Sequence, residues 1–421
     1  MKIAVVGGGS TYTPELVDGV ARLSADIDVT ELVLVDPDEG RLSVIGPLAA
    51  RIMAKYGHPA KVSWTADLDA AADGAGAVLL QLRVGGQATR NRDETWPLEY
   101  GCIGQETTGA GGFAKALRTV PVVLDVADRV RARALPDSWI IDFTNPVGIV
   151  TRALLDAGHR AIGLCNVAIG FQRSFASLLG VAPDAVALDH VGLNHLTWER
   201  AALVDGADRL PELIAKHGEE IALHTGLPLA ATTDYGAVPS YYLRYYWAHD
   251  AVVSEERGTQ TRAEAVAEIE RQLLEMYADP ALDTKPELLT HRGGAFYSEA
   301  AVALLASLVT DTRDRQVVNV RNNGTLPFLA DEAVIEVSAI VGADGATPVE
   351  VEPVDPLMRG LIAHVSAYEE LAVDAALRGG RDRVAKALLA HPLVGQYDLA
   401  QQLTDRLLAE NAEFLPWARG Q

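Results

Sequence analysis

Short runs of β-branched and aliphatic residues alternate with longer amphipathic stretches over the first 166 residues. The short runs predict strands at 3–6, 31–35, 77–82, 139–143 and 161–164, and the longer stretches predict helices at 14–23, 41–56, 121–134 and 147–157. Strands that alternate with helices in this way are typical of an α/β protein with a doubly wound parallel sheet. We therefore predict an N-terminal Rossmann-like domain over residues 1–166.

After residue 166 the pattern changes to shorter strand-like runs and long helical stretches. The runs lie at 185–190 and 200–204, the helical stretches at 262–278 and 296–310, a mixed strand region at 316–340 and further helices from about 355 to 413. We expect residues 167–421 to form an α+β domain that holds catalytic residues, substrate contacts and the oligomer interface.

The composition is that of a folded protein, with 49% hydrophobic and 22% charged residues, and it excludes a disordered chain. The formal net charge of −21 repels phosphate backbones and anionic lipids, so we expect neither a nucleic acid nor a membrane as a partner. Cys102 and Cys165 are too few for a disulfide framework and suit a reducing compartment. The N-terminal apolar run is too short for a signal peptide, and we expect a cytoplasmic protein.

Polar residues recur directly after the predicted strands. Gly7, Gly8, Gly9, Ser10 and Thr11 follow the first strand, Asp36 the second, Arg83 and, in the loop beyond it, Arg90 the third, Thr144 and Asn145 the fourth, and Cys165 and Asn166 the fifth. Open α/β sheets bind ligands outside the carboxyl ends of their strands. The sequence therefore places a candidate site at this edge of the sheet.

The segment from Gly7 to Thr11 has the composition of a dinucleotide-binding loop. Glycines let the backbone approach a pyrophosphate, and the next helix presents unpaired N–H groups to it. Tyr12 stands where the third glycine of the usual G-x-G-x-x-G pattern falls. Asp36 can accept hydrogen bonds from an adenosine ribose and repels a 2′-phosphate, which favours NAD over NADP. The alternative is an ordinary glycine-rich turn followed by an acidic loop residue.

Cys165 and His195 are candidate metal ligands, although neither belongs to a short metal-binding pair such as C-x-x-C. Spacing alone favours a buried cysteine and a core histidine, and His190 competes with His195 for a ligand role. Together, a cysteine and a histidine would suit a divalent transition ion with open positions for substrate oxygens.

Two further segments hold candidate chemistry. Glu106 lies in the glycine-rich segment 105–112, which we expect to be a loop over the strand ends, with a solvated surface loop as the alternative. The aromatic run 241–247 is more typical of packing than of chemistry, and the adjacent Tyr241 and Tyr242 cannot share one helix face.

Six motifs occur along the chain in a characteristic order. They are Gly-Gly-Gly-Ser-Thr-Tyr-Thr-Pro-Glu-Leu at 7–16, Arg-Val-Gly-Gly at 83–86, Gly-Gln-Glu-Thr at 104–107, Thr-Asn-Pro at 144–146, Cys-Asn at 165–166 and Gly-Leu-Asn-His at 192–195. Together they resemble glycoside hydrolase family 4, the NAD- and manganese-dependent glycosidases, and within it the 6-phospho-β-glucosidases. The likeness covers nearly the whole chain.

This resemblance implies a redox-assisted elimination. NAD takes a hydride from C3 of the sugar, a base removes the acidified proton on C2, the C1 aglycone leaves, water adds, and the hydride returns to C3. A divalent metal, expected to be Mn²⁺, polarises the C2 and C3 oxygens. The implied substrate is a phosphorylated disaccharide or glucoside, and the implied assembly is a homodimer or homotetramer.

The family motifs also imply roles for individual residues. Carried over by position, Cys165 and His195 are the metal ligands, Tyr242 is the C2 base with Tyr241 as the competing assignment, and Glu106 tunes that tyrosine. The cofactor would lie on Gly7, Gly8, Gly9, Ser10, Thr11, Asp36, Arg83 and Thr144, and the substrate on Arg90, Asn145, Asn166 and Arg262. An arginine guanidinium can bind a sugar phosphate with two parallel hydrogen bonds, and Arg83, Arg92 and Arg257 are further candidates for this contact.

Asn166 carries an expectation about specificity and catalysis. Members that act on 6-phospho-α-glucosides resemble this segment with Asp after the cysteine, an acid for the axial leaving group, whereas Asn accompanies the β-specific type. The family segment usually reads Cys-Asn-x-Pro, and Ala168 replaces the proline here.

Three other functions stay open. Another specificity of the same family would act on an unphosphorylated or α-linked substrate. An NAD-dependent 2-hydroxyacid dehydrogenase would share the lactate/malate dehydrogenase type of architecture that we expect for the two halves, but it needs no metal pair. A non-catalytic NAD or sugar-phosphate sensor would bind without turnover.

Overall fold

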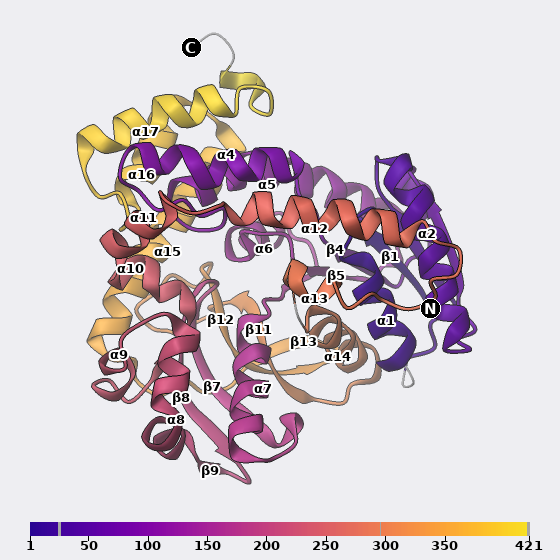
Figure 1. The fold of residues 1–421 in the computed structure, drawn as a ribbon, viewed down its shortest axis with the longest axis horizontal. Helices are drawn as coiled ribbons and strands as arrows, with labels where there is room; N and C mark the ends of the chain where they lie inside the picture. Colours follow the sequence, from indigo (N-terminus) through magenta and orange to yellow (C-terminus); the bar gives the residue numbers. More distant parts are fainter. Residues whose placement is uncertain (24–26, 295, 419–421) are drawn as a thin grey trace.

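A mixed sheet of nine strands forms the core of the part of the chain that the computed structural model describes, residues 1–23, 27–294 and 296–418 (Figure 1). Its order is β13-β12-β11-β6-β5-β4-β1-β2-β3. The strands are β1 (Lys2–Val6), β2 (Glu31–Val35), β3 (Lys61–Thr65), β4 (Ala77–Leu80), β5 (Trp139–Asp142), β6 (Ala161–Gly163), β11 (Asp314–Arg321), β12 (Val334–Gly342) and β13 (Gly345–Pro348). Strands β1 to β6 are parallel, in the order of a doubly wound nucleotide-binding sheet, which confirms the predicted fold class.

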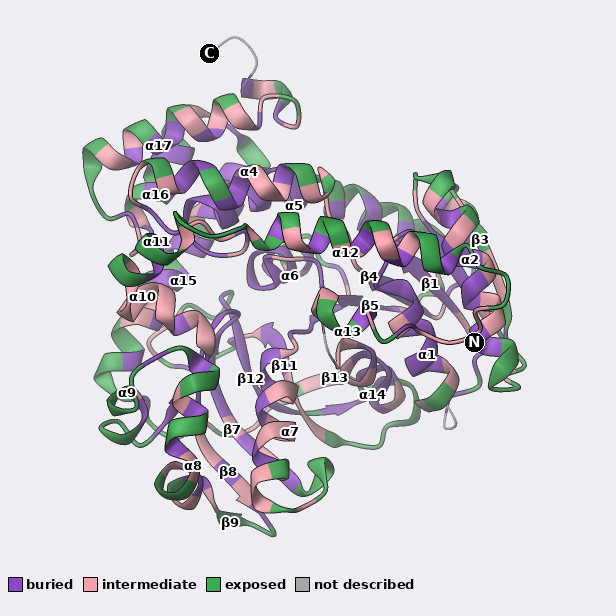
Figure 2. Cartoon of the chain, in the orientation of Figure 1, coloured by how far each residue is buried: buried purple, intermediate pink, exposed green. Residues whose placement is uncertain are grey.

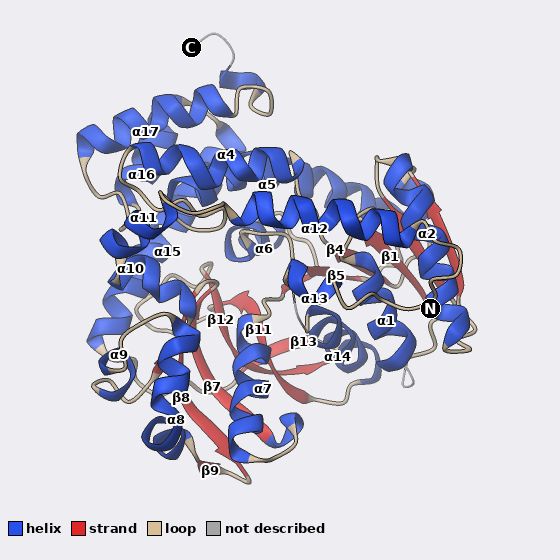
Figure 3. Ribbon diagram, viewed as in Figure 1, coloured by secondary structure: helices blue, strands red, loops and turns tan. Residues whose placement is uncertain are grey.

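Helices enclose the parallel strands (Figure 3). They are α1 (Thr13–Leu23), α2 (Glu39–Lys55), α3 (Leu68–Ala72), α4 (Gly86–Glu99), α5 (Gly109–Arg133) and α6 (Val147–Asp156). Strands β4 and β5 are nearly continuous apolar runs and are buried along their whole length (Figure 2). Such runs are expected where helices cover a parallel sheet from both sides, so burial explains why these residues form strands.

A second, smaller sheet packs against strand β12 of the first. Its described strands are antiparallel: β7 (Val186–Leu193), β8 (Leu196–Val204), β9 (Ala207–Asp208) and β10 (Val238–Pro239). The helices of this half are α7 (Val167–Leu179), α8 (Leu210–Thr225), α9 (Ala230–Thr233), α10 (Arg244–Trp247), α11 (His249–Glu256), α12 (Arg262–Tyr277), α13 (Leu289–Arg292), α14 (Tyr297–Thr310), α15 (Pro356–Arg378), α16 (Arg381–Ala390) and α17 (Tyr397–Glu410). Within the described ranges, no helix combines the length and apolar character needed to cross a membrane.

The large sheet continues past the boundary predicted at residue 166. Strand β11 pairs antiparallel with β6, and β12 and β13 extend the sheet further, so the mixed strand region predicted at 316–340 belongs to it. The division into 1–166 and 167–421 stays a prediction, but both parts build this one sheet. Hydrophobic patterns predict strands without their partners, which is why the sequence did not show the pairing.

Several element boundaries differ from those predicted. The strand predicted at 77–82 ends at Leu80, and the helix predicted at 121–134 is the second half of α5, which begins at Gly109. The expectation of a loop was therefore wrong for residues 109–112. A Cβ at Gly111 would lie 2.3 Å from the carbonyl oxygen of Asp93, so the glycines allow α5 to pack closely on α4. Strand β3 and the helices α3, α4, α7 and α8 were not predicted.

Asp142 is a fully buried carboxyl group at the end of β5, where the chain enters the site. Its oxygens accept hydrogen bonds from the Thr144 amide at 2.9 Å and the Thr151 hydroxyl at 3.5 Å. Burial raises the pKa of this carboxyl to about 8, because these hydrogen bonds offset only part of the lost hydration.

We expect Asp142→Asn to be more stable, relative to the wild type, at pH 8 than at pH 5. In the unfolded chain the carboxyl loses its proton near the ordinary pKa of 3.8, whereas the folded protein holds the proton up to about pH 8. The carboxyl therefore lowers the free energy of unfolding progressively as the pH rises through that window, and asparagine does not. Urea unfolding of both proteins at the two pH values measures this, and an equal stability difference at both would contradict it.

Candidate active site

The glycine-rich loop after β1 lies against the ends of two other strands. Gly7 has a φ of +85°, and a Cβ there would lie 2.6 Å from the carbonyl oxygen of Gln81. Asp36 follows β2, and its Oδ2 accepts a hydrogen bond from the amide of Gly9 at 3.0 Å. The structure thus brings the loop and Asp36 together at the carboxyl edge of the sheet.

Residues from the second half of the chain cover this loop. The guanidinium of Arg292 donates to Thr11 Oγ1 at 2.7 Å and to Ser10 Oγ at 3.4 Å, and it pairs with Glu270 at 3.0 Å. Glu270 also accepts a hydrogen bond from Thr11 Oγ1 at 3.1 Å. No local pattern predicts these contacts, because more than 250 residues separate Thr11 from Glu270.

Thr144 and Asn145 follow β5 at the same edge. The Thr144 hydroxyl accepts a hydrogen bond from the Leu82 amide at 3.1 Å, which ties the ends of β4 and β5 together. Asn145 precedes a cis proline, and its buried Oδ1 has no hydrogen-bond partner among the described residues. This carbonyl oxygen is therefore available to a ligand.

Glu106 is the centre of a cluster of cations. Its carboxylate pairs with Arg83 at 2.7 Å and Arg90 at 3.2 Å, and it also binds the buried Lys115. Burial acts to raise the pKa of Glu106, but Arg83, Lys115 and Arg90 hold it well below its usual value. Lys115 was missed from the sequence, although a lysine inside the apolar run Phe-Ala-Lys-Ala-Leu is itself a signal.

The other predicted arginines differ in their surroundings. Arg262, at the start of α12, donates to the carbonyl of His291. The amide of the next residue, Ala263, donates to Glu94, which also binds Arg90 at 2.6 Å, so Arg262 lies near Arg90. Arg92 pairs with Glu413, and Arg257 donates to the carbonyl of Leu98. Arg90 and Arg262 therefore come together, whereas Arg92 and Arg257 are engaged elsewhere.

Cys165 and His195 are both buried, and both lie near the carboxylate of Glu336. Cys165 follows β6, Asn166 caps α7, and His195 occupies the turn between β7 and β8 with a φ of +65°. The side chains of Asn194 and Tyr297 lie close to Cys165. Burial raises the pKa of the Cys165 thiol to about 12 and lowers that of His195 to about 4, so both are neutral near pH 7.

The predicted base candidates lie beside this pair. The ring of Tyr242 stacks on that of His195, with centroids 3.7 Å apart and planes at 10°. Tyr241 lies next to Tyr242 at 4.6 Å between ring centroids. Burial, Tyr241 and Cys165 raise the pKa of Tyr242 well above its usual value. Tyr242 thus contacts the candidate ligand His195 directly, and Tyr241 contacts Tyr242.

His190 does not compete with His195. Its Nδ1 lies 2.7 Å from Glu199 and its Nε2 lies 3.2 Å from Glu336, so both ring nitrogens are occupied. The buried Nδ1 of His195 has no hydrogen-bond partner among the described residues. In those ranges, no group of three or more His, Cys, Asp and Glu side chains is arranged around a metal position. A metal on Cys165 and His195 would keep open positions.

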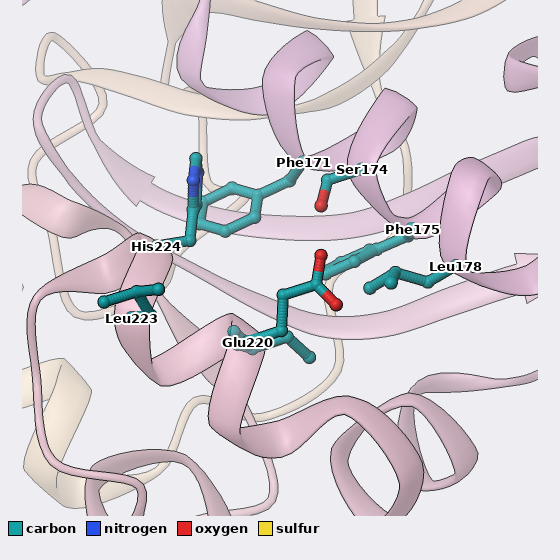
Figure 4. A pocket seen from close by; sticks show the side chains of 8 residues that line it. Phe171, Ser174, Phe175, Leu178, Glu220, Leu223 and His224 are labelled. Carbon is teal, nitrogen blue, oxygen red and sulfur yellow. The ribbon is translucent and has the colours of Figure 1, made fainter.

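A pocket of about 310 Å³ lies between α7 and α8 (Figure 4). It is lined by Phe171, Ser174, Phe175, Leu178, Glu220, Ile221, Leu223 and His224. The ring of His224 contacts Tyr241 at 6.3 Å between centroids. The pocket therefore adjoins the candidate site without containing Cys165, His195 or Tyr242.

Models of one enzyme family match both halves of the chain. Family 4 glycosyl hydrolase matches residues 2–181, and the Family 4 glycosyl hydrolase C-terminal domain matches residues 190–394. The chain belongs to glycoside hydrolase family 4. It is a glycosidase, and the resemblance carried by the sequence motifs is confirmed.

Family 4 relatives are similar over their full length. A probable 6-phospho-beta-glucosidase of Bacillus subtilis is 37% identical over 99% of this chain and 97% of its own length. The phospho-alpha-glucosidase PagL of Clostridium acetobutylicum is 30% identical, with 97% of each chain covered. The structure of the Thermotoga maritima 6-phospho-beta glucosidase with manganese, NAD+ and glucose-6-phosphate has a TM-score of 0.92 at 34% identity, covering 98% of this chain and 99% of that one.

A more distant likeness concerns the fold alone. The malate dehydrogenase of Salinibacter ruber has a TM-score of 0.55 at 19% identity, covering 91% of this chain and 99% of that one. The predicted architecture of the lactate/malate dehydrogenase type is therefore confirmed. This likeness in fold does not support a dehydrogenase activity, because proteins of one fold can have many different activities.

We expect Glu106→Gln to lower the free energy of unfolding by about 3–5 kcal/mol, because removing one partner of a buried ion pair leaves uncompensated charge. Lys115, Arg83 and Arg90 would all lose this carboxylate. Asp283→Asn is the matched control: it removes a carboxylate from Lys55 at a half-exposed pair and should cost less than about 1 kcal/mol. Urea unfolding measures both, and similar small losses would show that the Glu106 cluster is not held by charge.

Proposed function

We propose that this family 4 enzyme is a 6-phospho-β-glucosidase, which hydrolyses phosphorylated β-glucosides with NAD and a divalent metal. The observation that carries the proposal is the meeting of Cys165, His195 and Tyr242 in one buried cluster near several cationic side chains. The full-length similarity to enzymes named 6-phospho-beta-glucosidase supports the same substrate class.

The cations around Glu106 suit a phosphorylated sugar. Arg83, Arg90 and Lys115 share the carboxylate of Glu106, and Arg90 also pairs with Glu94 at 2.6 Å, so three cations face two carboxylates. Arg262 lies close to Arg90 through Glu94. This local surplus of positive charge contrasts with a chain whose net charge is −21. Because an arginine fork binds phosphate in a bidentate manner, we place the 6-phosphate at Arg90 and Arg262.

The residues at the carboxyl edge of the sheet fit NAD and a divalent metal. We place NAD on the loop from Gly7 to Thr11 with its ribose at Asp36, and the metal, Mn²⁺ by analogy with the relatives, at Cys165 and His195. A neutral imidazole with a free ring nitrogen is the form that coordinates a metal, as His195 has here. When bound, NAD supplies the acceptor for a hydride from C3, and the metal supplies a Lewis acid at the C2 and C3 oxygens.

Tyr242 is the proposed base for the proton on C2. Its side chain is half-buried and its pKa is raised well above the usual value, so the phenolate needs positive charge nearby. Arg90 lies close enough for its charge to interact with Tyr242, and Glu106 binds Arg90. We infer that Glu106 tunes Tyr242 by setting how much of the Arg90 charge reaches the phenol.

Asn166 favours a β-linked substrate. It directly follows Cys165 at the N-cap position of α7, and we place its side chain beside the proposed metal site. An amide cannot deliver a carboxyl proton to an axial leaving group, as the Asp of α-specific members is expected to do. The identity of 37% to a β-named relative against 30% to an α-named one points the same way.

Hydrolysis of matched p-nitrophenyl β-glucosides, with and without a 6-phosphate, tests the proposal. We expect nitrophenol release from the phosphorylated substrate only when NAD, Mn²⁺ and a reductant are all present, with no net NADH. Release from the unphosphorylated substrate alone would overturn the phosphate assignment, and release only from the matched α-glucoside would overturn the β assignment. Steady accumulation of NADH would indicate a dehydrogenase, and binding without turnover a sensor.

Tyr242→Phe should abolish exchange of the C2 proton with solvent deuterium, because phenylalanine keeps the stacked ring and lacks the hydroxyl. Mass spectrometry of glucose 6-phosphate incubated with NAD and Mn²⁺ in D₂O measures the exchange. Tyr241→Phe is the matched control and should retain most of it. If only Tyr241→Phe loses exchange, the base is Tyr241.

A further inference from the structure

A row of buried polar side chains crosses three strands beneath the proposed metal site. Glu199 of β8 lies 2.7 Å from His190 of β7, which lies 3.2 Å from Glu336 of β12. Glu336 Oε2 then accepts hydrogen bonds from Asn194 at 2.8 Å and Asn319 at 3.0 Å. Each residue of this row is less than a tenth exposed, so the row is isolated from solvent.

With one proton among them, Glu199, His190 and Glu336 carry one net negative charge. Burial acts to lower the pKa of His190, but the two carboxylates outweigh it and raise the pKa to about 10. Two carboxylates and an imidazolium sum to one negative charge, and moving the proton from His190 to Glu199 leaves that sum unchanged. A buried charge without a counter-charge is costly, so this one requires compensation from its surroundings.

The side of the trio that carries Glu336 faces the proposed metal ligands. Asn194, which donates to Glu336 Oε2 at 2.8 Å, directly precedes His195 in the turn between β7 and β8. Asn319 also donates to Glu336, at 3.0 Å, and it lies opposite Gly163, two residues before Cys165, so Glu336 is joined to the chain on both sides of the site. A cation on Cys165 and His195 would therefore meet the uncompensated charge directly.

We propose that Glu336 is a positioning residue of the cation site: it supplies the fixed negative charge beneath the site and holds Asn194, and through it the left-handed His195 turn. This inference rests on the proposed metal at Cys165 and His195. No spacing of ligands along the chain points to Glu336, which the fold brings in from a distant strand. Mutation of residues that orient metal ligands commonly changes metal affinity by about 10–100-fold.

The dissociation constant for Mn²⁺, measured from the free-ion signal in electron paramagnetic resonance, tests this role. We expect Glu336→Gln to weaken Mn²⁺ binding by about tenfold or more, because glutamine keeps the shape but removes the charge. Glu199→Gln is the matched control, since it takes a carboxylate from the same histidine on the side away from Asn194. It should change Mn²⁺ affinity by clearly less, and neither variant should change NAD affinity.

Each outcome decides between defined alternatives. Equal losses of Mn²⁺ affinity in both variants, or none in Glu336→Gln, would overturn the role of Glu336. If Glu336→Gln does not fold, Glu336→Asp keeps the charge but withdraws it from Asn194, and an Mn²⁺ affinity equal to the wild type would overturn the positioning role. A wild type that binds no Mn²⁺ in the presence of NAD and glucose 6-phosphate would contradict the proposed function itself.

Discussion

The short antiparallel pairing between β6 and β11 places residues from both halves of the chain around one site. Asn319 of β11 lies opposite Gly163 of β6 and, on its other side, opposite Glu336 of β12. A Cβ at Gly163 would lie 2.2 Å from Thr151 Oγ1 and 2.9 Å from the Cβ of Asn319, so the approach requires glycine. Because Cys165 follows Gly163 by two residues, the register of this pairing brings Glu336 close to Cys165.

Two buried clusters of opposite net charge act on His195. The cluster around Glu106 holds more cations than carboxylates, whereas the trio of Glu336, His190 and Glu199 holds more carboxylates than cations. His195 interacts electrostatically with Glu336, Lys115 and Glu106. A sugar phosphate has its anionic group at one end and metal-binding hydroxyls elsewhere, so this separation of charge would orient it and keep its phosphate away from the metal.

Local features of the site could be predicted from the sequence, and long-range ones could not. The Gly7 loop and Asp36 each follow a strand directly, so pattern and position identify them together. The prediction that Cys165 and His195 are metal ligands rested on the family motifs, because their spacing along the chain favoured a buried cysteine and a core histidine. Glu336 gave only a weak signal, a single acidic residue in an otherwise apolar strand, and its partners depend on a pairing that no local pattern encodes.

Burial keeps the reactive groups of this site uncharged in the free protein. It holds the thiol of Cys165 and the phenol of Tyr242 in their protonated forms, since their pKa values lie above the usual range. Either group could act as ligand or base only by losing that proton, and a thiolate on Cys165 would be repelled by Glu336. A cation at the site would compensate this charge. If Tyr242 is the base, its phenolate would likewise need a cation nearby, so removal of the substrate proton would be confined to the complex that holds one.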